Sequence, residues 1–381
     1  MQVIILAAGK GTRIHPISLT RPKPLFQLMG KTMIEYTLDQ LQGIADEVIL
    51  VVGYKGEMIQ KKIGSKYGKM RIRYVFLKQQ TGTGSAAASA SKIIKDKFLL
   101  LMGDDIYSKN DIKKLIKKFP AIVAQKVKTP KSFGIVTQKN GILINLAEKP
   151  ERPQSDLANT AMYYLHKDIF KYAIGKSARG EYEFTDYVKQ FASNNKLNVI
   201  VSKEWMPVPY VWNFFDVADL FLNKSKKEIK GKTEKVVVVK DKVIIKQGST
   251  IKSGAQIIGP TYIGKDCLVE KDCIIGPNTI IEDDCKILVG SVVKDCIIGS
   301  KTIVEESTII KNSILGVSCR IGNNVKFLNK AKTGNVKVMV NDNLVDSDRK
   351  LLGSFLGDNV KILDNVILSP GTKIEPNKTI K

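Results

Sequence analysis

Histidine is nearly absent from this chain of 381 residues, which contains only His15 and His166. Its five cysteines form no CxxC pair, and no histidine lies near them in the sequence. A zinc site of the zinc-finger kind needs closely spaced ligands of these two types, so such a site is excluded. No run of 18 apolar residues occurs, which argues against a transmembrane helix and against a membrane partner. Residues 1–8 have the pattern of a buried strand and not of a secretory signal, so a cytoplasmic location is expected.

Acidic residues are also few. The chain has 37 Asp and Glu against 61 Lys and Arg, which gives a formal net charge of +24. Such an excess of positive charge is compatible with binding of nucleic acid, with binding of anionic substrates, or with a lysine-rich surface exposed to solvent. The lysines are scattered and form no long basic block with interleaved aromatic residues, so no nucleic-acid partner is expected. A solvated surface is favoured, with a few cations left for anionic substrates.

The first 222 residues alternate short apolar segments with helical patterns. Strands are expected at residues 3–6, 47–52, 71–76, 98–102, 121–124, 161–165 and 197–201, and helices at residues 32–42, 84–95, 112–119 and 184–193. This alternation predicts an α/β, Rossmann-like domain with a mixed, mostly parallel sheet covered on both faces. We expect a first domain over residues 1–225, a lysine-rich linker over 226–235 and a second domain over 236–381.

The second domain repeats with a period of six residues. An aliphatic residue recurs at every sixth position from Val239 to Val293, and after two one-residue shifts the repeat continues to Ile380. A period of six fits neither a helix nor simple strand alternation, and it is typical of a hexapeptide, left-handed parallel β-helix. The polar stretch 328–353 interrupts the repeat and is expected to leave the prism as an extended loop.

The repeat also assigns positions to the cysteines and to a second set of aliphatic residues. All five cysteines fall on the small inward position, two residues before the large one, where a buried thiol acts as a small hydrophobic group. Outward aliphatic residues fall beside the inward ones and should form exposed rows on the flat walls. Such rows predict burial against another copy of the chain, and resemblance to hexapeptide-repeat proteins favours a homotrimer formed through the β-helix. The outward residues are Val238, Ile244, Ile258, Ile274 and Ile280.

The strongest local motif is the string LAAGKGTR at residues 6–13, which is followed by RPKP at residues 21–24. A strand ends there, and small residues then let backbone N–H groups approach a base edge or phosphate oxygens. Neither the phosphate-loop pattern GxxxxGK[ST] nor the dinucleotide pattern GxGxxG is present. The whole string resembles the signature of the sugar-1-phosphate nucleotidylyltransferases.

That resemblance implies two nucleotide-binding segments. The segment QQTGTG at residues 79–84 resembles the family's nucleotide-base loop. Where family members often carry a base-reading glutamine, this chain has Leu77, so the choice of base stays open, with UTP or dTTP favoured. The residues implied to contact the nucleotide are Leu6, Ala7, Ala8, Gly9, Gly11, Thr12, Gln79, Gln80, Gly82 and Thr83.

The resemblance further implies a metal site and a sugar site. Asp104, at the end of an apolar strand, resembles the family's metal aspartate, and Asp216 is the second implied Mg²⁺ ligand, with Asn213 as its alternative. On the sugar side, Gly134 fits the glycine that approaches the sugar, Glu148 fits the acid of the EKP element, and Asn159 fits the sugar-contacting asparagine. Glucose-1-phosphate or N-acetylglucosamine-1-phosphate is the favoured sugar substrate.

The implied reaction is an in-line attack of a sugar-1-phosphate oxygen on the α-phosphorus of a nucleoside triphosphate, with pyrophosphate as the leaving group. Three cations are implied to be catalytic. Arg13 would hold the β- and γ-phosphates, while Lys23 and Lys149 would balance charge near the α-phosphate and the sugar phosphate.

The layout as a whole resembles archaeal and bacterial enzymes that join a uridylyltransferase to a left-handed β-helix acetyltransferase. In those enzymes a histidine of the β-helix acts as the base, and this chain has no histidine after His166. We therefore expect a degenerate acetyltransferase part. Two alternatives stay open: a bifunctional enzyme that also acetylates glucosamine-1-phosphate, and a non-catalytic binding subunit like those of translation-initiation exchange factors.

Overall fold

A computed structural model describes residues 1–381 and divides them into two compact units. The first unit contains Met1–Lys10 and Met33–Pro207, and the second contains Gly11–Thr32 and Val208–Lys381. The boundary between the units therefore divides the signature string after Lys10. None of the helices combines the length and the apolar character that crossing a membrane requires.

The first unit is built on one ten-stranded mixed sheet with the order β5-β6-β4-β1-β7-β11-β8-β12-β10-β9. Parallel pairs join β1 to β4 and β7, β4 to β6, and β8 to β12, whereas β11 runs antiparallel to β7 and β8. The strands are β1 (Gln2–Ala7), β4 (Glu47–Val52), β5 (Lys66–Tyr67), β6 (Met70–Phe76), β7 (Lys97–Met102), β8 (Ala121–Lys126), β9 (Ile135–Lys139), β10 (Ile142–Ala147), β11 (Leu157–His166) and β12 (Asn198–Ser202).

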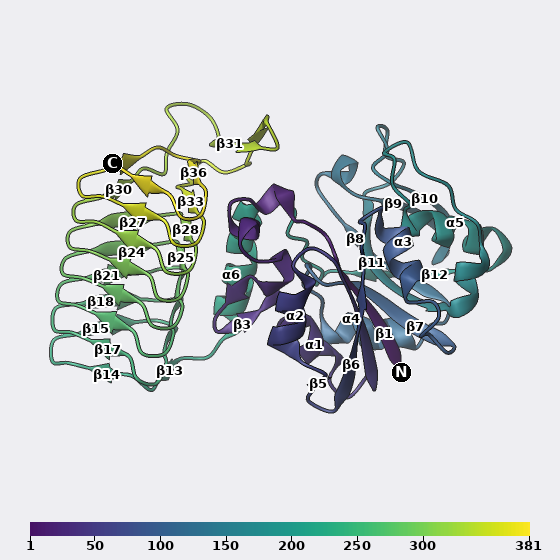
Figure 1. Cartoon of the computed structure of the whole chain (residues 1–381), viewed down its shortest axis with the longest axis horizontal. Helices are drawn as coiled ribbons and strands as arrows, with labels where there is room; N and C mark the ends of the chain where they lie inside the picture. The colour runs from purple at the N-terminus through teal and green to yellow at the C-terminus, as the bar shows by residue number, and fades with distance from the viewer. The chain divides into compact units, whose positions relative to one another are not determined.

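Five helices belong to this unit, and they are visible around the sheet in Figure 1. They are α1 (Met33–Leu41), α2 (Gly56–Ile63), α3 (Thr83–Ser89), α4 (Lys109–Ile116) and α5 (Phe184–Asn194). The helix predicted over 84–95 ends at Ser89, and the helix predicted from residue 112 begins at Lys109. That earlier start has a local cause, because the Ser108 hydroxyl accepts a hydrogen bond from the Asp111 N–H at 3.1 Å and so caps the helix. The remaining predicted strands and helices are present, which confirms the α/β prediction.

The second unit contains a parallel β-helix with three walls. The first wall consists of β13 (Glu228–Ile229), β16 (Val243–Ile245), β19 (Thr261–Ile263), β22 (Thr279–Ile281), β25 (Ile297–Ile298), β28 (Ile314–Leu315), β33 (Phe355–Leu356) and β36 (Lys373–Ile374). The second consists of β14 (Lys232–Thr233), β17 (Thr250–Ile251), β20 (Leu268–Val269), β23 (Lys286–Ile287), β26 (Ile303–Val304), β29 (Arg320–Ile321), β34 (Lys361–Ile362) and β37 (Thr379–Ile380). The third consists of β15 (Val238–Lys240), β18 (Gln256–Ile258), β21 (Ile274–Ile275), β24 (Val292–Lys294), β27 (Ile309–Lys311), β30 (Lys326–Phe327) and β35 (Ile367–Leu368).

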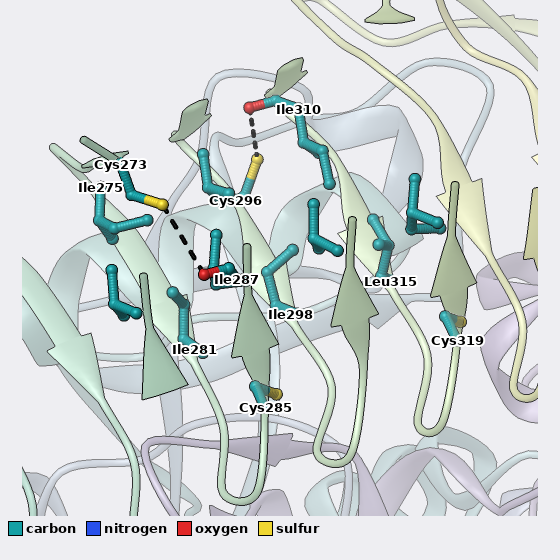
Figure 2. Close-up of a cluster of buried hydrophobic side chains, with 14 of the residues drawn as sticks. Cys273, Ile275, Ile281, Cys285, Ile287, Cys296, Ile298, Ile310, Leu315 and Cys319 are labelled. Carbon is teal, nitrogen blue, oxygen red and sulfur yellow. Dashed lines mark hydrogen bonds between the residues drawn. The ribbon is translucent and has the colours of Figure 1, made fainter. Parts of the chain in front are cut away.

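The core of the prism contains the aliphatic positions of the six-residue repeat. From Ile245 to Ile374 these residues form one buried cluster, with Val239 and Ile380 partly buried at its two ends. All five cysteines are free and buried in the same cluster. Figure 2 shows Cys273 and Cys296 between the isoleucines, each close to a backbone carbonyl of the next coil. The β-helix prediction and the structural role of the cysteines are confirmed.

The prism begins earlier than the repeat suggested. Strands β13 and β14 lie inside residues 226–235, the segment predicted as a linker, and they pair in parallel with β16 and β17. Ile229 pairs with the inward Ile245 but precedes it by 16 residues instead of 18, and Thr233 stands opposite the inward Ile251, so the hexad pattern is not visible in the sequence. The predicted interruption after residue 328 contains the antiparallel hairpin of β31 (Lys337–Val340) and β32 (Asn343–Asp346), before the repeat resumes at β33.

One wall of the prism contradicts the predicted exposed rows. On the first wall, Ile244 and Ile280 belong to an outward row that is buried, with exposed fractions of 7% and 0%. The residues 11–32 of the same unit cover this wall: the Glu282 carboxylate accepts hydrogen bonds from the Gln27 side chain and the Gly30 N–H. Helix α6 (Phe214–Lys224) and the turn before it also belong to this unit. On the third wall, Val238 is exposed at 40% as expected, whereas Ile258 and Ile274 are half-buried.

Candidate active site

The end of β7 is held tightly against the end of β1. The Gly103 N–H donates to the Leu6 carbonyl at 2.8 Å, and a Cβ on Gly103 would lie 3.0 Å from the Ala7 Cβ. A glycine is therefore needed at position 103 for the two strand ends to lie this close. Asp104 follows directly and lies just beyond the carboxyl end of β7, the strand next to β1. Ligands of α/β sheets bind at such strand ends. The structure thus brings Asp104 together with the first half of the signature string.

Asp105 is a structural residue and not a solvated neighbour of Asp104. Its carboxylate accepts a hydrogen bond from the Trp205 indole at 3.0 Å. Tyr107, buried just beyond, donates its hydroxyl hydrogen to the Thr160 carbonyl and accepts from the Met102 N–H, both at 3.1 Å. Burial, and then the Asp105 charge, raise the pKa of Tyr107 well above its usual value, so it stays a neutral donor. These contacts fix the turn that presents Asp104.

The predicted base loop is tied to a second loop of the same unit. Gly82 has φ 122°, and a Cβ there would overlap the backbone of Tyr182, so only glycine fits. The Gly84 N–H donates to the Tyr182 carbonyl at 2.7 Å, and the Phe184 N–H donates to the Thr83 hydroxyl at 3.0 Å. The predicted nucleotide-binding residues Gly82 and Thr83 are therefore positioned by the residues that begin α5.

The two glutamines of this loop differ in their surroundings. Both are exposed, but the Gln80 amide nitrogen lies 3.1 Å from the position that a Cβ on Gly53 would occupy. The same position is 3.0 Å from the Ala8 carbonyl, so Gln80 lies near the end of the β1 segment. The Gln80 side chain and the Ala8 carbonyl thus both lie beside Gly53.

The three predicted sugar-binding residues converge. A Cβ on Gly134 would lie 2.9 Å from a Glu148 carboxylate oxygen and 3.6 Å from the Asn159 Cβ. Backbone hydrogen bonds hold this arrangement, because the Asn159 N–H donates to the Gly134 carbonyl at 2.7 Å and the Lys149 N–H donates to the Phe133 carbonyl at 3.2 Å. The Asn159 side chain donates to the Tyr163 hydroxyl at 2.5 Å, which orients its amide.

Arg179, which the sequence did not single out, links the sugar cluster (Gly134, Glu148 and Asn159) to the base loop at residues 79–84. Arg179 contacts Glu148 and Glu183, each at 3.3 Å. Glu183 in turn accepts from the Thr83 hydroxyl at 3.4 Å. Burial, followed by repulsion from Glu183, raises the pKa of Glu148, while Lys149 and Arg179 lower it. Arg179 lies four residues before Glu183 in the chain, and no motif marks it in the sequence.

The second half of the signature lies in the second unit. Gly11 has φ 63°, and its carbonyl accepts from the Ser18 hydroxyl at 2.7 Å. A Cβ on Gly11 would touch the Cβ of Lys23 at 3.4 Å, so the buried Lys23 packs directly behind the glycine. Arg13 is exposed, and its guanidinium lies 6.0 Å from the Tyr210 ring centroid. Arg13 and Lys23 thus both flank the glycine turn.

The predicted second metal ligand is engaged with other side chains. One oxygen of Asp216 accepts from Arg349 at 2.5 Å, and the other accepts from the Asn213 amide at 3.0 Å. The Asn213 side-chain oxygen Oδ1 accepts from the Tyr210 N–H at 3.1 Å, so Asn213 caps the turn before α6 and this oxygen is already used. Of the two candidates, only Asp216 has a carboxylate, and its side chain is 43% exposed.

No group of three or more His, Cys, Asp or Glu side chains that could hold a metal ion occurs in the structure. Mg²⁺ commonly uses only one or two carboxylates and completes its shell with water and substrate phosphates. Single carboxylates such as Asp104 and Asp216 are suitable donors for an ion of that kind.

Comparison with known proteins gives a consistent result. Residues 2–224 match the nucleotidyl transferase family, and residues 257–381 match the GMPPB C-terminal domain. This chain belongs to the nucleotidyl transferase family. The bifunctional protein GlmU of Methanocaldococcus jannaschii is 36% identical over 386 residues, which cover 99% of this chain and 92% of that protein. A bifunctional sugar-1-phosphate nucleotidylyltransferase/acetyltransferase of Sulfurisphaera tokodaii is 34% identical and covers 98% and 94% of the two chains.

Among solved structures, UDP-glucose pyrophosphorylase complexed with UDP-glucose is similar to this nucleotidyl transferase, with a TM-score of 0.54 at 20% identity. The match covers 59% of this chain and 99% of that chain. At this level of identity the similarity shows a shared fold.

Proposed function

We propose that this protein is a sugar-1-phosphate nucleotidylyltransferase, which transfers a nucleotidyl group to a sugar-1-phosphate and releases pyrophosphate. The observation that carries the proposal is the convergence of Gly134, Glu148 and Asn159, linked through Arg179 and Glu183 to the base loop. The Sulfurisphaera tokodaii relative, which has that activity in its name and matches 98% of this chain, supports the same conclusion.

The sugar cluster is suited to hydroxyl groups. Glu148 and Asn159 provide acceptors and a donor, and the missing side chain of Gly134 leaves room beside the Glu148 carboxylate. Arg179 holds that carboxylate from one side, so its orientation is set before a ligand arrives. Preorganised hydrogen-bonding groups reduce the cost of ordering on binding.

The transfer itself needs positioning and charge neutralisation and no protein nucleophile. We assign Arg13 to the β- and γ-phosphates, and Lys23 and Lys149 to the charge near the α-phosphate and the sugar phosphate. The divalent cation, which we propose to be Mg²⁺, supplies charge neutralisation at the phosphates when bound. Asp104 and Asp216 are the carboxylates that we propose for it.

The nucleotide and the sugar are assigned by chemical class. UTP or dTTP is favoured as the nucleotide, and glucose-1-phosphate or N-acetylglucosamine-1-phosphate as the sugar. A direct test measures pyrophosphate release from UTP, dTTP, ATP, CTP and GTP with glucose-, N-acetylglucosamine-, glucosamine- and mannose-1-phosphate, with and without Mg²⁺. Release that requires one sugar-1-phosphate and one triphosphate supports the proposal. No release with any pair would favour the non-catalytic binding subunit.

A second activity, acetylation of glucosamine-1-phosphate, is suggested by the printed names of the relatives, which are called bifunctional. We propose that this chain lacks it, because His166 is its last histidine and no imidazole base is available in residues 228–381. Mass spectrometry of a mixture with acetyl-CoA and glucosamine-1-phosphate tests this. Enzyme-dependent N-acetylglucosamine-1-phosphate would contradict it.

A further inference from the structure

The hairpin of residues 328–353, which interrupts the β-helix, contacts a residue that the proposed function assigns to the divalent cation. Arg349, just beyond β32, donates to Asp216 at the start of α6, 133 residues earlier in the chain. Its guanidinium also lies 5.7 Å from the Phe215 ring centroid. The side chain of Arg349 is 29% exposed, so the ion pair is partly shielded from water.

Several hydrogen bonds fix the hairpin in this position. The Val336 N–H donates to the Arg349 carbonyl at 2.8 Å, which holds the arginine at the base of the hairpin. Lys373, in strand β36 of the prism, donates to the Met339 carbonyl at 3.0 Å. At the tip, the Asn341 amide donates to the Thr12 hydroxyl of the signature string at 3.3 Å. One hairpin therefore contacts two elements to which the family resemblance assigns substrate or metal.

Asp216 lies among further acidic residues. Asp219, one turn along α6, interacts electrostatically with Asp216 and with Asp295 of the prism. Arg349 is the cation that acts on this acidic group. A divalent cation would also compensate the charge of these carboxylates, and it carries two positive charges where the guanidinium carries one. Oxygen atoms of carboxylates are donors that Mg²⁺ prefers.

We propose that Arg349 is a built-in counter-ion that occupies Asp216 when no divalent cation is bound, so that the cation and the guanidinium compete for this carboxylate. Binding of the cation with its nucleotide then releases Arg349 and loosens the hairpin. This inference rests on the proposed assignment of Asp216. Arg349 is a positioning residue in this scheme, because it acts through Asp216 and not on the reacting atoms.

The test measures cation binding directly. Mn²⁺, which reports its free concentration in electron paramagnetic resonance, is titrated into the full chain with UTP present and sugar-1-phosphate omitted, so that no turnover occurs. Arg349→Gln removes the competing charge and should tighten Mn²⁺ binding by roughly two- to fivefold, the range that a partly exposed ion pair can contribute. Arg320→Gln, an exposed arginine of the second wall, is the matched control and should leave binding unchanged. Far-UV circular dichroism of the variant that matches the wild type would show that a gain in affinity does not come from damage to the fold.

Hydrogen–deuterium exchange of residues 336–349 provides a second readout. In the wild type, Mn²⁺ with UTP should increase exchange in this segment, and in Arg349→Gln the increase should already be present without the cation. Unchanged or weaker Mn²⁺ binding in Arg349→Gln, or unaltered exchange in the wild type, would overturn the proposal. An Asp216→Asn variant that binds Mn²⁺ with the affinity of the wild type would also overturn the proposal. If competition is observed but no sugar-1-phosphate yields pyrophosphate, only the proposed function fails.

Discussion

Replacing Glu282 by glutamine should stabilise the second unit above neutral pH. Glu282 is 1% exposed on the first wall of the prism and is covered by residues 27–30 of the same unit. It accepts from the Gly30 N–H at 2.9 Å and from the Gln27 amide at 3.0 Å, while its other carboxylate oxygen has no hydrogen-bond partner. Desolvation outweighs these bonds and raises the pKa of Glu282 from 4.5 to about 7.

The direction of the pH dependence follows from this shift. Between pH 4.5 and about 7, the folded protein keeps the proton on Glu282 while the unfolded chain releases it. The stability that protonated Glu282 contributes is therefore complete below its unfolded pKa and is lost as the pH rises through the folded pKa. At 1.36 kcal/mol per pKa unit, the loss amounts to about 3 kcal/mol. Glutamine keeps an acceptor for Gly30 and carries no charge, so Glu282→Gln should avoid this loss.

The assay is urea unfolding of the full chain at a series of pH values, with hydrogen exchange of strands β22 and β25 reporting on the second unit alone. The unfolding free energy of Glu282→Gln relative to wild type should grow by about 2–3 kcal/mol from about pH 4.5 to about pH 8. Glu306→Gln, at an exposed corner of the prism, should show no such growth. A difference that stays flat or shrinks with rising pH would refute the reasoning.

Three further predictions concern activity and assembly. Arg13→Ala and Asp104→Ala should each lower kcat at least about 100-fold, because a charge that acts mainly in the transition state is removed; near-normal turnover in both would show that the site assignment is wrong. Gly134→Ala should raise KM for the sugar-1-phosphate more than KM for the nucleotide, since its Cβ would lie 2.9 Å from the Glu148 carboxylate, and steady-state kinetics with Gly175→Ala, where a Cβ meets open space, as the control would check this. Full-length protein should form an oligomer, with a trimer favoured, through the walls of the prism that residues 11–32 leave uncovered. Light scattering that finds a monomer at micromolar concentration would exclude this assembly.

The sequence alone determined the features that depend on local repetition. The hexad positions predicted the buried cluster of the prism because each coil repeats the same inward residue, and stacked coils place equivalent positions above one another. In the same way, apolar segments in alternation with helical patterns predicted the strands of the mixed sheet. The cysteines were assigned correctly because their position in the repeat fixed their burial.

The tertiary structure decided the features that join distant residues. Nothing in the sequence around Arg179 or Arg349 indicates that these side chains meet Glu148 and Asp216, because such pairs depend on how loops return to the sheet or to the prism. The outward isoleucines of the first wall illustrate the same limit. Alternation along a strand predicts which side chains leave the core, but residues 11–32, more than 200 positions away, decide whether water or the chain itself covers them.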